Sequence, residues 1–217
     1  MKYKSTRGGV AGLGFTDALL MGLASDGGLL VPESIPDVTS ELEDLRHCSF
    51  VELAQHIVGM FVDDIDTPTL NRLITEAYST FDHPEVVGWH ELDKVTVVEL
   101  FHGPTLAFKD VALQLLGQLF QHVLALRNQR LNILGATSGD TGGAAIAGVR
   151  GQDNVDIFIL YPKGRVSPLQ ELQMTTVSDS NVHCIEVDGT FDDCQRIMKD
   201  TFSVIALVGV MFYQNWK

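Results

Sequence analysis

Lys109 is the residue whose position in this sequence best suits covalent chemistry. It follows Leu106, Ala107 and Phe108 and stands where a helix is expected to begin. A helix N-terminus disfavours a cation by several tenths of a kcal/mol, roughly, and partial burial beside Phe108 would add a desolvation cost. Both effects favour the neutral amine, which is the form that Schiff-base chemistry needs. From this segment alone, a surface lysine with its stem over the apolar run stays open as the alternative.

A second segment, GATSGDTGGAA at 135–145, places hydroxyls and glycines where a strand is expected to give way to a helix. Free backbone N–H groups and the helix dipole make such a turn suitable for an anion. The alternative is a purely structural turn. In that case Thr137 or Ser138 caps the helix, while Gly142 and Gly143 allow it to pack closely on the sheet.

A third segment, YPKGRVSP at 161–168, follows the next expected strand and carries Lys163, Arg165 and Ser167. Two cations at a strand end could bind an anionic substrate, although a solvated turn is an equally good interpretation.

Several familiar motifs fail on their spacing. The serine-hydrolase elbow needs glycine at the positions that Ala136 and Asp140 occupy around Ser138. Neither the phosphate-binding P-loop nor the dinucleotide fingerprint is present, and Lys94 stands where a zincin would place its second histidine. No metal site is predicted.

The elements that must position these segments change in kind near Val95. Before it, the pattern predicts helices that start near Phe15 and span 50–61 and 68–81, with Thr16 as a cap and 29–32 extended. After it, strands are expected to alternate with helices, which favours a parallel sheet covered on both faces. The expected strands are 96–100, 131–134, 155–160 and 182–187, and the expected helices are 111–126, 141–149 and 169–176, with a capping box at Thr190 and Asp193.

Composition points to an ordinary soluble globule of 217 residues, with 45% hydrophobic and 20% charged residues. The 28 acidic and 15 basic residues give a net charge of −13, which makes nucleic acid and anionic membranes poor partners. The cysteines, Cys48, Cys184 and Cys194, are odd in number and lack C-x-x-C spacing, which favours a reducing compartment. No long apolar run predicts a signal or a membrane span, so the cytoplasm is expected.

Taken together and in order, three segments closely resemble threonine synthase. They are FHGPTLAFKD at 101–110, ATSGDTG at 136–142 and YPKGRVSP at 161–168. The stretches STRG at 5–8 and LASDGGLLVPE at 23–33 resemble the N-terminal domain of that family. The resemblance runs from about residue 3 to about residue 202. It implies an α/β chain with a helical N-terminal domain at 1–92 and an incomplete type II pyridoxal-phosphate (PLP) domain at 93–217.

The resemblance also implies a reaction and a site. The reaction is the conversion of O-phosphohomoserine and water to threonine and phosphate, with PLP joined to Lys109 in a Schiff base. Lys109 would then move protons at the α and β carbons of the substrate, while the cofactor acts as the electron sink. Asp140 would contact the cofactor, and the substrate carboxylate would bind Thr137, Ser138, Gly139 and Thr141. Lys163, Arg165 and Ser167 are our expected contacts to the substrate phosphate.

The last residues, 203–217, depart from the family, and members of the family are about twice as long. Their later Gly-rich loop, which cradles the cofactor phosphate, has no counterpart here. A sheet cut partway and an apolar tail at 204–212 would expose apolar surface, so we expect poor solubility, self-association or a need for a partner. Two alternatives stay open beside threonine synthase: a related phospho-lyase or hydroxy-amino-acid dehydratase, and a catalytically inactive fragment.

Overall fold

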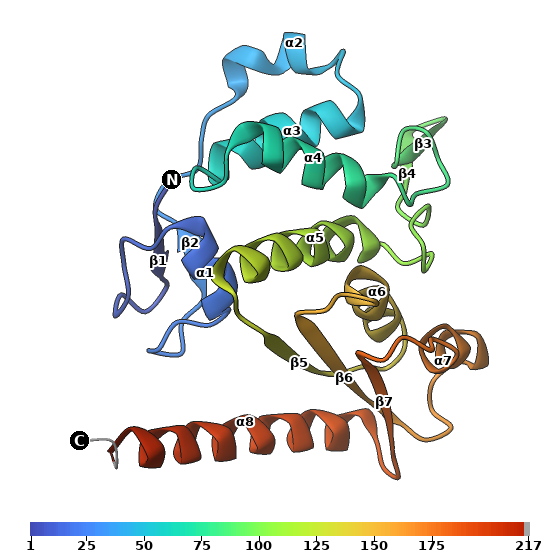
Figure 1. Cartoon of the computed structure of the whole chain (residues 1–217). Helices are drawn as coiled ribbons and strands as arrows, with labels where there is room; N and C mark the ends of the chain where they lie inside the picture. Colours follow the sequence, from blue (N-terminus) through green and yellow to red (C-terminus); the bar gives the residue numbers. More distant parts are fainter. Residues whose placement is uncertain (215–217) are drawn as a thin grey trace. The chain divides into compact units, whose positions relative to one another are not determined.

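The structure is a computed structural model that describes the backbone of residues 1–214 and the side chains of residues 1–202 (Figure 1). Internal contacts divide the chain into two compact units, Met1–Val123 and Leu124–Lys217, and each is described by itself. The boundary between the units falls inside helix α5 (Asp110–Arg127), whereas the sequence pattern changes near Val95. The predicted domain boundary at 92/93 therefore stays a prediction.

The first unit holds a small two-stranded sheet, several helices and a β-hairpin. Its elements are β1 (Tyr3–Ser5), α1 (Phe15–Met21), β2 (Leu30–Pro32), η1 (Thr39–Glu41), α2 (Leu42–Leu45), α3 (Phe50–Phe61), α4 (Thr67–Tyr78), β3 (Gly88–Leu92), β4 (Val95–Glu99) and most of α5 (Asp110–Arg127). The predicted helix at 50–61 is confirmed by α3, and α4 confirms the next helix with shifted ends. A capping box of Ser49 and Glu52 starts α3.

The predicted capping role of Thr16 is wrong. Helix α1 begins at Phe15 with Gly14 as its N-cap, so Thr16 already lies inside the first turn. Its backbone N–H and its hydroxyl both donate to Asp64 Oδ2 at 2.9 Å. A residue from the loop before α4 therefore satisfies the start of this helix.

The core of the first unit joins α3, α4 and α5. Nine buried residues form it: Val62, Ile65, Leu70, Leu73, Ile74, Tyr78, Val86, Leu119 and Val123. Tyr78 donates its hydroxyl to the carbonyl of Val111 at 3.0 Å, which ties α4 to the first turn of α5. The packing of α4 therefore fixes the place where α5 begins.

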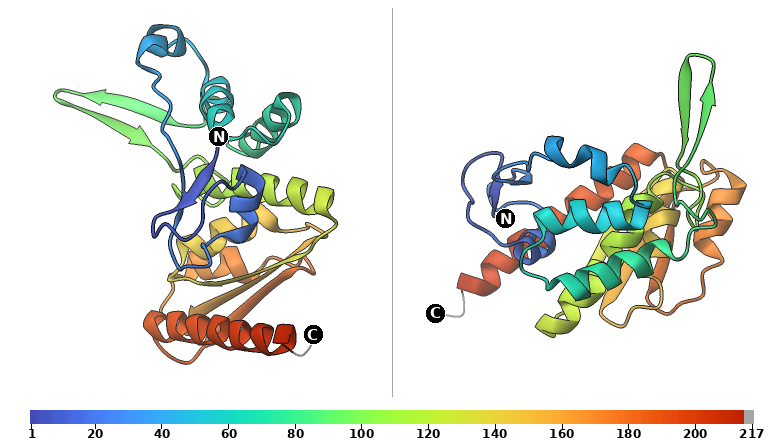
Figure 2. Two further views of the ribbon diagram at one scale, coloured as in Figure 1. Left: turned by 90° about the vertical axis from the view of Figure 1, so that its left-hand side faces the viewer. Right: turned by 90° about the horizontal axis from the view of Figure 1, so that it is seen from above.

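Strands β3 and β4 correct one expectation. The predicted strand at 96–100 exists as β4, but it pairs antiparallel with β3 and takes no part in the parallel sheet. Leu92 pairs with Val95, so only Asp93 and Lys94 join the strands, and so short a connection permits only an antiparallel pair. Figure 2 shows the hairpin extending away from α3 and α4.

The second unit is a parallel α/β layer. Its elements are β5 (Leu131–Ala136), α6 (Asp140–Val149), β6 (Val155–Pro162), α7 (Pro168–Thr175), β7 (Val182–Val187) and α8 (Phe191–Gln214). The strands are parallel in the order β5-β6-β7, and Figures 1 and 2 place α8 on one face of the sheet and α6 and α7 on the other. The predicted parallel sheet with helices on both faces is confirmed, as is the largely buried central strand β6.

Register brings the candidate loops of this unit to one edge. Ala136 at the end of β5 pairs with Leu160 near the end of β6, so the turns that follow the two strands leave the sheet on the same side. This edge is where open α/β sheets bind ligands.

Helix α8 begins with the predicted capping box. Thr190 donates its N–H and its hydroxyl to Asp193 Oδ2, and the Asp193 N–H donates back to Thr190. These bonds, with Arg196, hold the pKa of Asp193 down at about 2. The side chains of residues 203–217 are outside the part that the structure describes. The prediction that this stretch departs from the family therefore stays a prediction.

Candidate functional site

Lys109 lies at the end of the loop that precedes α5. Its side chain is half-buried, and its Nζ lies 4.4 Å from the centroid of the Phe108 ring, as the neighbouring apolar run predicted. Phe108 is itself 59% exposed, so the amine stands beside a ring that solvent still reaches. This arrangement places a primary amine, the group that Schiff-base chemistry uses, beside an apolar ring.

Asp110, the next residue, is 0% exposed and holds this loop together. Its carboxylate accepts from the Thr105 N–H at 2.8 Å, from the Thr105 hydroxyl at 2.9 Å and from Gln114 Nε2 at 3.0 Å. No pattern in the sequence by itself singles out this carboxylate.

His102, at the other end of the loop, lies between two carboxylates. Its Nε2 is 2.8 Å from Glu99 Oε2 and its Nδ1 is 3.1 Å from Asp82 Oδ1. The other oxygen of the Glu99 carboxylate, Oε1, lies 3.0 Å from His90 Nε2. The hydrogen bond to Glu99, followed by that to Asp82, raises the pKa of His102, and His102 lowers the pKa of Glu99. These ion pairs tie the loop to the base of the hairpin.

In the second unit, Thr137 shapes the turn at the start of α6. Its side chain is buried, and its hydroxyl oxygen accepts the backbone N–H groups of Gly139 at 3.0 Å and Gly142 at 2.9 Å. Asp140 Oδ1 accepts the Thr141 N–H at 2.7 Å. Ser138 and Thr141 are exposed residues of a turn whose shape Thr137 fixes, and the Thr141 hydroxyl donates to Asp140 Oδ1 at 3.3 Å.

Gly139 brings this turn against α7. Its φ of 146° lies in the region that favours glycine, and a Cβ there would approach Gln170 Oε1 to 2.2 Å. Ser167 donates its hydroxyl to the same Gln170 oxygen at 3.0 Å and caps α7 by accepting from the Gln170 N–H. Gln170 therefore links the turn at 137–141 to the turn at 163–167.

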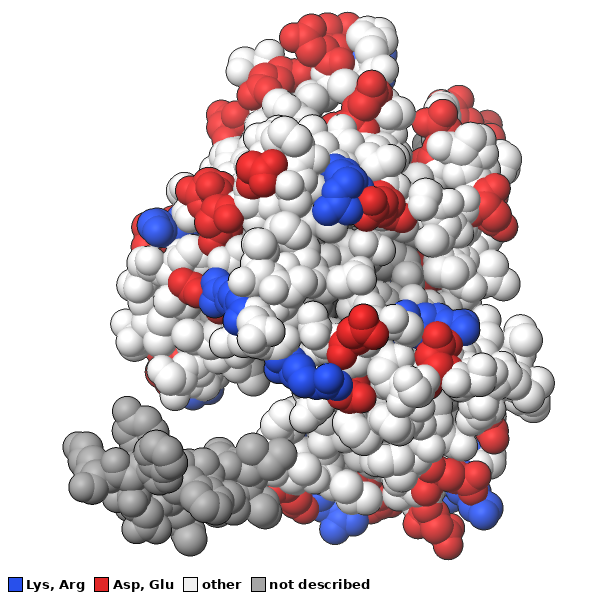
Figure 3. All heavy atoms as spheres, in the orientation of Figure 1, with Lys and Arg blue, Asp and Glu red and all other residues white. Residues whose placement is uncertain are grey.

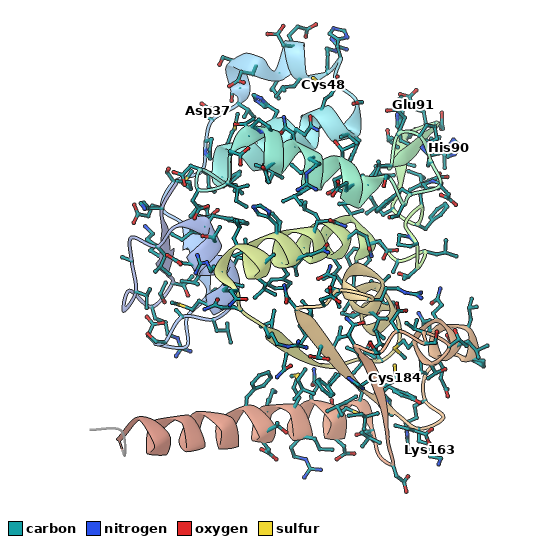
Figure 4. All side chains as sticks on the ribbon, in the orientation of Figure 1. Asp37, Cys48, His90, Glu91, Lys163 and Cys184 are labelled. Atoms are coloured by element: carbon teal, nitrogen blue, oxygen red, sulfur yellow. The ribbon has the colours of Figure 1, made fainter. Side chains whose placement is uncertain are left out.

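Lys163 and Arg165 lie in the turn after β6, and both are exposed. Lys163 is labelled in Figure 4. Its Nζ forms an ion pair with Glu186 of β7 at 2.9 Å, which raises the pKa of the lysine. A substrate phosphate at Lys163 would have to compete with this carboxylate.

The predicted residues thus fall into two groups. Lys109 belongs to the first unit, and the second unit brings the 137–141 turn and the 163–167 turn together at one sheet edge. Sequence reasoning missed His102, Asp110 and Gln170. Only Gln170 had a signal, because Ser167 and Gln170 have the S-x-x-Q spacing of a capping box.

The fold and these turns define an α/β chain of the fold type II class, with a parallel sheet in its second unit, a lysine before a helix and a polar strand-to-helix turn. In sequence and in fold, the chain corresponds to the N-terminal portion of the threonine synthase family. A family profile described as "Threonine synthase N terminus" matches residues 2–78.

Individual relatives agree. The threonine synthase of Schizosaccharomyces pombe is 46% identical and is aligned over 100% of this chain and 45% of its own length. That of Pseudomonas aeruginosa is 50% identical over 94% of this chain and 44% of its own length. A crystal structure of PLP-bound threonine synthase from Brucella melitensis matches 94% of this chain and 44% of its own chain, with 52% identity and a TM-score of 0.88. This chain therefore spans a little under half the length of these relatives.

Along the described part of the chain, no helix has the length and apolar character needed to cross a membrane.

Acidic side chains gather at the top of the face drawn in Figure 3, where η1 and α2 contribute Glu41, Glu43 and Asp44.

Proposed function

We propose that this chain supplies the cofactor lysine and the substrate-carboxylate turn of a threonine synthase. The reaction is the conversion of O-phosphohomoserine and water to threonine and phosphate, a lyase-type reaction on a phosphorylated amino acid, and we place it in the cytoplasm. The observation that carries the proposal is the 52% identity to a PLP-bound threonine synthase over 94% of the chain, joined to a half-buried lysine at the loop–helix junction.

The residues present fit the covalent anchor of PLP. Lys109 offers a primary amine beside the exposed ring of Phe108, on a loop whose buried carboxylate is already occupied by Thr105 and Gln114. When bound, the cofactor would supply an electron sink for charge that develops at the substrate α carbon.

The roles proposed for these residues come from the resemblance to threonine synthase, and the geometry of the turn supports part of them. Lys109 would hold the cofactor and then move protons at the α and β carbons of the substrate, and Asp140 would contact the cofactor. The hydroxyls of Ser138 and Thr141, with the backbone at Gly139, would bind the substrate carboxylate, while Thr137 keeps the turn in shape. Arg165, Lys163 and Ser167 are proposed for the substrate phosphate. Lys163 would do so only by exchanging Glu186 for phosphate.

The test is covalent trapping. The protein is incubated with PLP, reduced with borohydride, digested and analysed by mass spectrometry, with Lys109→Ala as the variant and Lys94→Ala as a matched control. We expect a stable adduct on Lys109 that the Lys94→Ala change leaves intact. An adduct spread over surface lysines, or none at all, would favour the inactive-fragment alternative.

A related phospho-lyase reaction stays open as the alternative, because some relatives carry a name that marks them only as similar to threonine synthase. Proteins named threonine synthase-like 2 from Xenopus laevis and Mus musculus are 42% identical to this chain. A phospho-lyase acting on a similar substrate would use the same residues. Product analysis separates the two, because threonine synthase yields threonine and phosphate from O-phosphohomoserine, whereas the alternative yields a different carbon product.

A further inference from the structure

Asp110 carries a buried carboxylate, and the proposed function assigns it no part in binding or chemistry. It is 0% exposed, and a buried carboxylate is costly unless several donors satisfy it. Here the donors are the N–H and the hydroxyl of Thr105 and the side-chain amide of Gln114. Two of the three come from the loop that leads to Lys109.

The loop is folded tightly against this carboxylate. A Cβ at Gly103 would lie 2.4 Å from Asp110 Cβ, so only glycine permits the approach. Leu106 has a φ of 61°, which L residues rarely adopt, and its N–H donates to the Gly103 carbonyl at 3.0 Å. The Asp110 N–H then donates to the Ala107 carbonyl at 3.0 Å.

Lys109 is the last residue of this closed loop. Its carbonyl accepts the N–H of Leu113 at 2.9 Å, so its backbone already belongs to the start of α5. The direction of its side chain therefore depends on the geometry of the loop on one side and of the helix on the other, and Asp110 bonds to both.

We propose that Asp110 is the positioning residue of Lys109. By holding Thr105 and Gln114 at once, it joins the loop to α5 and fixes the direction in which Lys109 presents its amine. The inference rests on the proposed function only in one respect, namely that the Lys109 amine forms the Schiff base with PLP.

Three substitutions test it. Asp110→Asn keeps the size but leaves a single acceptor oxygen for three donors. Thr105→Val keeps the shape and removes the hydroxyl, whereas Thr105→Ser keeps the hydroxyl and serves as the matched control. Two properties are measured without cofactor: amide hydrogen exchange of residues 103–109, and acetylation of Lys109 by acetic anhydride relative to Lys94 in the same sample.

We expect Asp110→Asn and Thr105→Val to speed exchange in the loop by roughly tenfold and to change the Lys109-to-Lys94 labelling ratio several-fold. Thr105→Ser should behave as the wild type, and exchange in α3 should not change. Unchanged loop exchange and labelling would overturn the proposal. So would an equal rise of exchange in α3, because that indicates a general effect on stability.

Trapping with PLP then separates this inference from the proposed function. If the wild type yields no adduct on Lys109, the proposed function fails, while the inference is still decided by exchange and labelling. If the wild type yields the adduct and Asp110→Asn yields it at the same rate, the proposed function survives and the positioning role of Asp110 is refuted.

Discussion

His102 shows how single residues set the conditions under which the Lys109 loop is held. Its ring lies between Asp82 and Glu99, and its side chain and that of Glu99 are only 14% and 19% exposed. The centroid of the His102 ring lies 4.6 Å from the centroid of the His83 ring. The Glu99 carboxylate also pairs with His90. The imidazole of His102 thus lies beside two carboxylates and the ring of His83, while His90 pairs with the second oxygen of Glu99.

This arrangement predicts a pH window for stability. The pKa of His102 is raised above its ordinary 6.5, so the stabilisation from its protonated form is complete below that pH and is lost as the pH rises through the folded value. The pKa of Glu99 is lowered from 4.5, so its contribution is present above that pH and is lost as the pH falls through the folded value. Both contributions are present from roughly pH 4.5 to 6.5.

The measurement is the free energy of unfolding from denaturant titrations between pH 4 and pH 8. The wild type should lose stability as the pH rises above this window, and His102→Gln should flatten that part of the curve. His47→Gln, at an exposed histidine after α2, is the matched control and should keep the wild-type slope. The same slope in His102→Gln would contradict the role assigned to His102.

At the scale of elements, helix α6 packs on the sheet through one of two adjacent glycines. A Cβ at Gly142 would lie 2.6 Å from Thr137 Cγ2, 2.7 Å from Met174 Sδ of α7 and 3.0 Å from Ile159 Cγ2 of strand β6. A Cβ at Gly143 would meet nothing closer than 3.9 Å. The predicted close packing of the helix on the sheet therefore belongs to Gly142 and leaves Gly143 with room.

The two glycines make a paired prediction. Gly142→Ala should destabilise the protein by about 1–3 kcal/mol, because the added methyl pushes on Thr137 and on the turn that Thr137 shapes. Gly143→Ala should be neutral or stabilising by up to about 1 kcal/mol, because alanine favours a helix. Urea titration of both variants measures the change in the free energy of unfolding. Equal changes in the two variants would contradict the close packing of α6 at Gly142.

At the scale of the molecule, two features have opposite effects on self-association: the exposed apolar surface of the hairpin β3–β4 and the high net charge of the chain. Its large apolar side chains are exposed on both faces: Trp89, Leu92, Val95, Val97 and Val98 are 43–63% exposed. Exposed apolar area of this kind marks an interaction or aggregation surface. The net charge of −13 opposes contact between copies of the chain.

We therefore predict association that depends on salt and concentration. Raising the ionic strength screens the repulsion, so the mass from light scattering should rise above 23.8 kDa with both protein and salt. Replacing Trp89 and Val98 with lysine should suppress the rise. Leu42→Lys on α2, a residue 57% exposed, is the matched control. A single mass of one chain under all conditions would contradict the prediction.

Much of the fold could be predicted because its signals are local. Helices α3, α5, α6 and α7 and strands β5, β6 and β7 follow apolar spacing, β-branched runs and capping residues. The prediction that the strand at 96–100 joins the parallel sheet is wrong, because its own residues do not reveal that a two-residue turn pairs it with β3.

The sequence alone determined the kinds of residue available for chemistry, namely a lysine before a helix and a hydroxyl-rich turn after a strand. Only the tertiary structure decided what holds them: Asp110 beneath the Lys109 loop, Gln170 against Gly139, and Glu186 on Lys163. Hydrogen bonds and ion pairs of this kind depend on where side chains meet in space. Spacing along the chain encodes which element a residue belongs to, but not which carboxylate or amide it meets.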